Sequence, residues 1–157
     1  MRNRTALVSG AGIGGPALAY WLSRSGFEVT VVERAPRVRP GGQAVDFKGA
    51  VQRTVLARMG IRQEIQQRST GATDMVFVDE RGVERARISG DFTGGDVEIL
   101  RGDLAGIIYE RSAPHCDYVF GDSIAALRDT ADGVDIEFEH RPAQRFDLVF
   151  GADGIHS

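Results

Sequence analysis

A glycine-rich segment near the amino terminus has the residue types and the spacing that bind a dinucleotide. It directly follows an apolar run at residues 5–9 and consists of Gly10, Ala11, Gly12, Ile13, Gly14 and Gly15. Glycines at its first, third and sixth positions allow a sharp turn, close approach of a pyrophosphate and tight helix packing. Glu33 ends the next apolar run, about 20 residues further on, where such units carry an acid. The pattern predicts a βαβ unit that holds an anionic ligand at a helix N-terminus.

The elements that must position these residues can be read from the same stretch. Pro16 falls in the first turn of the expected helix, where a missing N–H costs nothing. The face that covers the sheet is predicted from apolar residues at helical spacing, namely Ala17, Leu18, Trp21 and Leu22. Residues 28–33 form the second strand, and Glu33 at its end should accept hydrogen bonds from a ribose. The alternative is an ordinary glycine-rich turn, with Glu33 as a solvated charge.

The rest of the chain predicts a mixture of helices and strands. Helices are expected over residues 50–59, 62–67 and 101–111, and strands over residues 74–78, 83–88, 97–100 and 117–120. A hairpin is expected from residues 123–128 and 134–139. Residues 147–152 are apolar throughout, which predicts a parallel strand buried on both faces. Residues 34–42, with three arginines, are either a linker or a basic flap beside a phosphate-rich ligand.

Composition limits the kinds of partner. The chain has 157 residues, suits one domain, and carries a net charge of −3 with 42% hydrophobic residues. We expect no nucleic-acid partner, because no basic stripe with interleaved aromatics is present. We expect no membrane partner, because no apolar run approaches the length of a membrane span. The single Cys116 cannot form an internal disulfide, which indicates a reducing, cytoplasmic location.

Other kinds of active site find little support in the sequence. The histidines lack the spacing of a metal site, and we interpret them as surface or turn residues: His115, His140 and His156. Ser9 and Ser157 have no visible partner in a Ser–His–Asp arrangement. We therefore predict no metal and assign no catalytic side chain.

Several segments, taken in order, resemble the flavoprotein aromatic hydroxylases related to p-hydroxybenzoate hydroxylase, and the tetracycline-inactivating flavin monooxygenases are similar. These segments are residues 10–16, 31–34, 41–49, 100–104 and 147–157, the last of which contains Asp153-Gly154. The resemblance implies an α/β, Rossmann-like FAD/NAD(P)-binding three-layer fold with an inserted antiparallel β-meander. It also implies that residues 1–157 are an FAD-binding domain, the N-terminal part of a longer protein.

The resemblance further implies roles for single residues. The glycine segment would hold the FAD pyrophosphate, Glu33 would bind the adenosine ribose, and Arg34 would lie beside the adenine or its phosphates. Arg101, at the start of a helix, would contact the flavin side of the cofactor, although an ion pair with Asp103 is the alternative. Asp46 lies near a position where some relatives use an acid on FAD. Asp153 would belong to a fingerprint that touches both FAD and the nicotinamide donor.

The reaction implied by the resemblance is hydroxylation of an aromatic or other electron-rich small molecule by O₂, with FAD reduced by NADPH or NADH. The chain ends before the family's second flavin motif and before the domain that builds most of the substrate pocket. We therefore expect no substrate-coupled hydroxylation from these residues alone, and the oligomeric state is left open. Alternatives are a nicotinamide dehydrogenase domain or a non-catalytic nucleotide-binding domain, and flavin reductases and halogenases share the N-terminal pattern.

Overall fold

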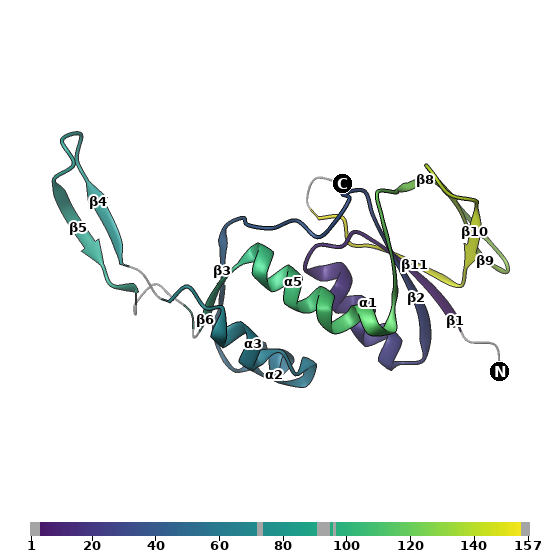
Figure 1. Cartoon of the computed structure of the whole chain (residues 1–157), viewed down its shortest axis with the longest axis horizontal. Coiled ribbons are helices and arrows are strands. Elements are labelled where there is room, and N and C mark those ends of the chain that lie inside the picture. Colours follow the sequence, from purple (N-terminus) through teal and green to yellow (C-terminus); the bar gives the residue numbers. More distant parts are fainter. Residues whose placement is uncertain (1–3, 72–73, 91–94, 96, 155–157) are drawn as a thin grey trace. The chain divides into compact units, whose positions relative to one another are not determined.

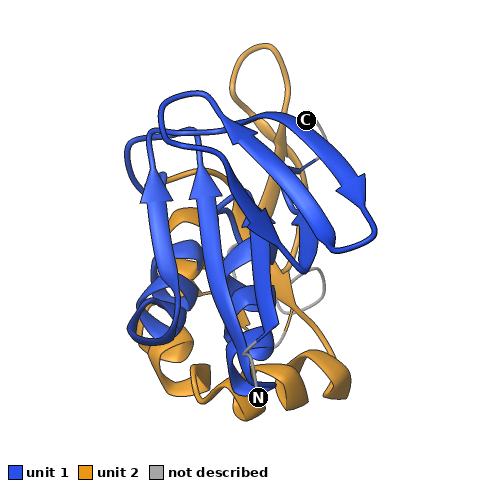
Figure 2. Ribbon diagram, turned by 90° about the vertical axis from the view of Figure 1, so that its right-hand side faces the viewer, with its two compact units in different colours: residues 1–40, 105–157 blue, residues 41–104 orange. Residues whose placement is uncertain are grey.

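The computed structural model describes residues 4–71, 74–90, 95 and 97–154. The chain divides into two compact units, one made of Met1–Pro40 with Ala105–Ser157 and the other of Gly41–Leu104 (Figure 2). A single FAD-binding domain over residues 1–157 therefore stays a prediction, and each unit is described by itself. His156 and Ser157 lie outside the described residues.

The first unit is built on a parallel sheet of four strands (Figure 1). In spatial order the strands are β11 (Leu148–Gly151), β1 (Arg4–Ser9), β2 (Phe27–Glu33) and β7 (Asp117–Phe120). Every neighbouring pair is parallel. Helix α1 (Gly14–Arg24) joins β1 to β2. The βαβ unit predicted from the glycine segment is therefore confirmed.

An antiparallel meander covers one face of this sheet. It consists of β8 (Ile124–Thr130), β9 (Gly133–Phe138) and β10 (Gln144–Phe146). Leu7 and Val32 of the sheet pack against Phe146 and Ile136 of the meander, and all four are at most 2% exposed. Each such side chain contributes about 1.5–3 kcal/mol by leaving water. The predicted hairpin is confirmed, and β10 extends it to a third strand.

Helix α1 covers the other face, which completes three layers. Val8 and Val31 of the sheet pack with Ala19 of the helix in a second buried cluster. The predicted helix face is partly wrong, because Ala19 and Tyr20 are buried whereas Trp21 is 37% exposed. The Trp21 ring packs edge-on against the Tyr20 ring, with ring centroids 5.1 Å apart, and Trp21 is not part of the buried cluster between helix and sheet. The α/β three-layer fold with an antiparallel meander is confirmed.

Strand β11 corrects another prediction. It is parallel, as predicted, but Leu148 is 41% exposed and neither face of the strand is fully buried. The reason is its position, because β11 lies at the edge of the sheet and pairs only with β1 among the described strands. Continuous apolarity indicates burial only where neighbours cover both faces.

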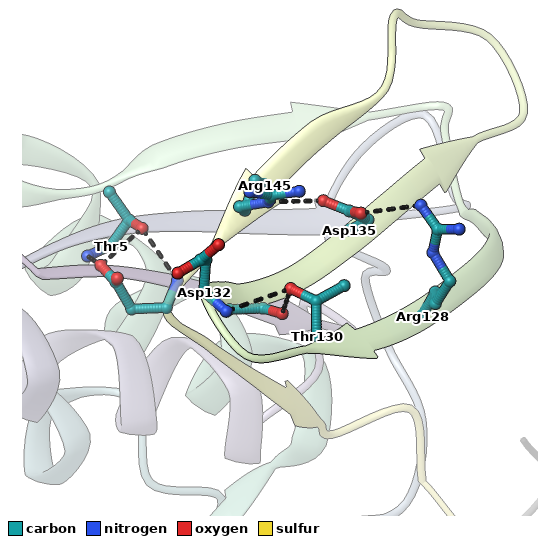
Figure 3. Close-up of polar contacts among 8 residues, drawn as sticks. Thr5, Arg128, Thr130, Asp132, Asp135 and Arg145 are labelled. Carbon is teal, nitrogen blue, oxygen red and sulfur yellow. Dashed lines mark hydrogen bonds and ion pairs between the residues drawn. The ribbon is translucent and has the colours of Figure 1, made fainter.

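Hydrogen bonds and ion pairs between polar side chains join neighbouring segments of the first unit (Figure 3). Asp135 of β9 accepts from Nε of Arg145 at 2.6 Å and from Nη2 of Arg128 at 3.1 Å. These contacts hold the pKa of the Asp135 carboxyl below its usual value, the Arg145 hydrogen bond having the largest effect. At the start of β1, the Thr5 N–H and hydroxyl both donate to Asp147 Oδ2, at 2.7 and 3.0 Å.

The second unit combines two short antiparallel sheets with helices. Strand β3 (Ala44–Phe47) pairs with β6 (Val97–Leu100), and β4 (Met75–Val78) pairs with β5 (Glu84–Ile88). Helices α2 (Ala50–Met59) and α3 (Arg62–Gln67) have the predicted bounds. Gly60 separates them with φ +72°, a left-handed conformation that ends α2. Strand β3 was not predicted from the sequence.

Helix α5 (Arg101–Ser112) contains the boundary between the two units and leads into the short helix η1 (Ala113–His115). In the first unit, the Ser112 hydroxyl lies 2.6 Å from the Tyr118 hydroxyl on β7. Tyr109 packs edge-on against the Tyr118 ring at 4.8 Å between centroids. Burial in this aromatic cluster raises the pKa of the Tyr118 phenol.

Within the described residues, no helix has the length and apolarity needed to cross a membrane.

Candidate dinucleotide-binding site

Two glycines shape the loop between β1 and α1, and a side chain at either position would clash with the backbone around it. Gly10 has φ +100° and donates its N–H to the Val32 carbonyl at 2.8 Å. A Cβ on Gly10 would lie 2.6 Å from the Ala152 carbonyl oxygen. A Cβ on Gly15 would lie 1.8 Å from the Gly10 carbonyl oxygen. Backbone therefore packs directly on backbone at both positions.

The other two glycines of the loop face open space. A Cβ on Gly12 or on Gly14 would meet no atom within 4 Å. Ile13 is the N-cap residue of α1, and among the described residues no side chain caps this helix end. The first turn of α1 also carries no acidic residue. The N-terminal amides and the positive end of the helix dipole are therefore available to an anion that approaches over Gly12.

Glu33 connects the end of β2 to this loop. Its Oε2 accepts from the Ala11 N–H at 2.8 Å, and its Oε1 accepts from the Ala35 N–H at 2.8 Å. The side chain is 15% exposed, and Nη2 of Arg39 lies 4.0 Å from Oε1. A carboxylate has about four acceptor positions, so Glu33 can also accept from the hydroxyls of a ribose. The structure thus brings together the loop and the acid that the sequence singled out.

Asp153 lies against the same loop from the other side of β1. The Ser9 hydroxyl donates to Asp153 Oδ1 at 2.6 Å, and the Ala152 N–H donates to the Ser9 carbonyl at 2.7 Å. A Cβ on Gly10 would lie 3.0 Å from the Asp153 Cα. Sequence reasoning considered Ser9 only as a nucleophile and missed this pairing. The available signal was that Ser9 ends one expected strand and Asp153 follows another, and that the second was expected to be parallel.

Three predicted cofactor residues remain, namely Arg34, Asp46 and Arg101. Arg34 follows Glu33 and is exposed. Asp46 and Arg101 lie in the second unit, where Asp46 Oδ1 accepts from the Gly95 N–H at 3.3 Å and the Arg101 N–H donates to the Gln43 carbonyl at 2.9 Å. The alternative ion pair between Arg101 and Asp103 is not formed within the described part of the chain. Their roles at a cofactor stay predictions.

Asp122 supports the end of β2 and was missed by sequence reasoning. It is 4% exposed, and its Oδ1 accepts from the N–H groups of Ser123 at 2.8 Å and His140 at 3.0 Å. Its own N–H donates to the Glu33 carbonyl at 3.2 Å. A buried carboxylate that satisfies two backbone amides fixes the local chain path. The Gly121-Asp122 pair after an apolar strand indicated a turn of this type.

The chain is similar to several known proteins. The family model of the NAD(P)-binding Rossmann-like domain matches residues 8–61. A protein of Mycobacterium tuberculosis is 44% identical over 98% of this chain and 43% of its own length. A flavin-dependent monooxygenase of Legionella longbeachae is 40% identical over 99% of this chain and 41% of its own length. The crystal structure of the tetracycline destructase Tet(51) matches 99% of this chain and 40% of its own, with a TM-score of 0.87 and 35% identity.

Over nearly its whole length the chain is similar to flavin-dependent monooxygenases. The resemblance predicted from the glycine segment and the Asp153-Gly154 pair is confirmed. The chain spans about two fifths of the length of the relatives that it matches.

Proposed function

We propose that this chain is the FAD-binding portion of an NAD(P)H-dependent flavin monooxygenase that hydroxylates an aromatic or other electron-rich small molecule. The observation that carries the proposal is the loop between β1 and α1. Gly12 and Gly14 face open space in front of an uncapped helix N-terminus, with the Glu33 carboxylate bonded to the same loop at Ala11. This arrangement fits the pyrophosphate and ribose of an adenine dinucleotide.

The loop and the predicted residues outside it have separate roles in this proposal. The amides at the start of α1 bind the pyrophosphate, and Glu33 accepts from the ribose while it keeps the Ala11 amide in place. Asp153 offers a second carboxylate at the loop, and Arg34 lies next to Glu33, where it can contact the adenine. Asp46 and Arg101 are also proposed to contact FAD. Bound FAD would supply the redox chemistry, with NADPH or NADH as the electron donor.

Relatives favour FAD as the dinucleotide. The Legionella longbeachae protein is a flavin-dependent monooxygenase, and Tet(51) is a tetracycline destructase. The matched domain family is described as NAD(P)-binding, which makes a nicotinamide dehydrogenase domain the second candidate. The aromatic substrate is proposed for the whole protein, and a cytoplasmic location stays a prediction that rests on Cys116.

The test is direct titration of the purified chain with FAD and, separately, with NADH. We expect saturable FAD binding that is tighter than NADH binding, with unchanged FAD released on denaturation. Glu33→Ala should lower FAD affinity at least tenfold, the effect of losing hydrogen bonds to a charged group. Glu28→Ala, at the opposite end of the same strand, is the matched control. Tighter binding of NADH than of FAD would favour the dehydrogenase, and binding of neither would reject both candidates.

A further inference from the structure

Two hydroxyl–carboxylate hydrogen bonds join β1 to the segment that contains β11. At the amino end of the strands, the Thr5 hydroxyl donates to Asp147 Oδ2 at 3.0 Å (Figure 3). At the carboxyl end, the Ser9 hydroxyl donates to Asp153 Oδ1 at 2.6 Å. The two strands are parallel, with Ala6 opposite Leu148 and Ser9 opposite Gly151. The two bonds are therefore chemically alike, but only the second lies beside the glycine loop.

The Ser9 hydroxyl determines where the Asp153 carboxylate lies. Asp153 is exposed and follows Ala152, the first residue after β11, whose N–H donates to the Ser9 carbonyl. Beyond this backbone bond, the Asp153 side chain would rotate among its staggered conformers. A hydroxyl that donates to a carboxylate at 2.6 Å forms a short, charge-assisted hydrogen bond, which selects one conformer.

The selected conformer has a consequence at the loop. Oδ1 of Asp153 is occupied by Ser9, and Oδ2 lies 3.8 Å from the position that a Cβ on Gly151 would take. A free carboxylate next to a pyrophosphate site repels the ligand unless its oxygens are directed at hydroxyl donors. With Oδ1 held on Ser9, Oδ2 would be able to accept from a hydroxyl of a dinucleotide bound at the proposed site.

We propose that Ser9 is a positioning residue for FAD binding, which orients the Asp153 carboxylate beside the glycine loop. The proposal rests on the proposed FAD site. Ser9 does not contact the cofactor and acts only through Asp153.

The experiment compares FAD dissociation constants and thermal unfolding for matched variants of the whole chain. Ser9→Ala should weaken FAD binding about tenfold, the effect of one hydrogen bond to a charged group. Thr5→Val removes the corresponding hydroxyl at the other end of β1. It should lower the unfolding temperature about as much as Ser9→Ala does, but it should leave FAD affinity unchanged. Ser9→Thr keeps the hydroxyl and should keep FAD affinity, which also covers the case in which Ser9→Ala folds poorly.

A double-mutant cycle tests whether Ser9 acts through Asp153. In an Asp153→Ala background, Ser9→Ala should cause no further loss of FAD affinity. The proposal is overturned if Ser9→Ala binds FAD as the wild type does, if its loss persists in the Asp153→Ala background, or if Thr5→Val weakens FAD binding equally. Absence of FAD binding by the wild-type chain would instead overturn the proposed function on which this inference depends.

Discussion

Replacing Gly12 by alanine should weaken FAD binding at the glycine loop without destabilising the fold. A Cβ on Gly12 would meet no protein atom within 4 Å, and Gly12 is not among the glycines with positive φ. The free protein therefore accepts the methyl group without strain. Because alanine restricts the unfolded chain more than glycine does, we expect Gly12→Ala to leave stability unchanged or to raise it by up to about 1 kcal/mol.

The same methyl group should obstruct the ligand. A phosphate oxygen that accepts from a loop amide must approach the backbone nitrogen to about 2.9 Å, and the methyl group of Gly12→Ala occupies that approach. Losing one hydrogen bond to a charged phosphate costs about 1.5–3 kcal/mol, which corresponds to a loss of affinity of roughly 10- to 150-fold. The expected result is a folded, stable variant that binds FAD at least tenfold more weakly.

The assay pairs calorimetric titration of FAD with thermal unfolding in the absence of ligand. Gly14→Ala is the matched control, because its Cβ would also meet nothing within 4 Å, whereas the dinucleotide pattern does not require glycine at that position. Gly14→Ala should therefore retain FAD affinity. Wild-type affinity in Gly12→Ala would refute the idea that the pyrophosphate approaches the backbone at this residue.

Three further outcomes follow from contacts elsewhere in the first unit. Gly15→Ala should lower the free energy of unfolding by about 3 kcal/mol, because the new Cβ would lie 1.8 Å from the Gly10 carbonyl oxygen; denaturant unfolding equal to wild type would contradict this. Tyr118→Phe should cost about 1 kcal/mol at neutral pH through its lost hydrogen bond to Ser112. Because the folded-state pKa of Tyr118 is raised, the stability of the wild type should fall as the pH rises above about 10. Unfolding measured against pH should show a smaller loss of stability at alkaline pH in Tyr118→Phe. The Asp135 pKa is lowered, so its contribution is present above about pH 4 and is lost as the pH falls through the folded-state value. Asp135→Asn should flatten this acid dependence of the unfolding temperature, and an unchanged acid limb would show that the Arg145 contact does not stabilise the fold.

Elements defined by local patterns were predictable from the sequence. The βαβ unit follows from an apolar run, glycines at fixed spacing and a second apolar run that ends in Glu33. Helices α2 and α3 have the predicted bounds because the left-handed Gly60 interrupts an otherwise helical stretch. In each case the pattern itself lies in one continuous stretch of the sequence, so composition and spacing were enough to predict the element.

Elements determined by distant partners were not predictable. Strand β10 contains Gln144 and Arg145, and it is a strand because it pairs with β9. Trp21 and Leu148 were expected to be buried and are exposed, because burial depends on what covers each surface. The Ser9–Asp153 contact joins residues 144 positions apart. Tertiary packing, rather than local propensity, decides such features.

The glycine loop also explains why so much of the site was visible in the sequence. Residues 10–16 contain no lysine or arginine, and Glu33 and Asp153 place two carboxylates at the same loop. An anion bound there would be stabilised by backbone amides and the helix dipole rather than by charged side chains. Binding therefore depends on the path of the backbone, and Gly10 and Gly15 set that path because no side chain fits beside them. Because this backbone geometry requires glycine at fixed positions, the spacing of the glycines predicts the site from the sequence. Ser9 and Asp122 act through side-chain contacts with distant residues, and no such spacing predicts them.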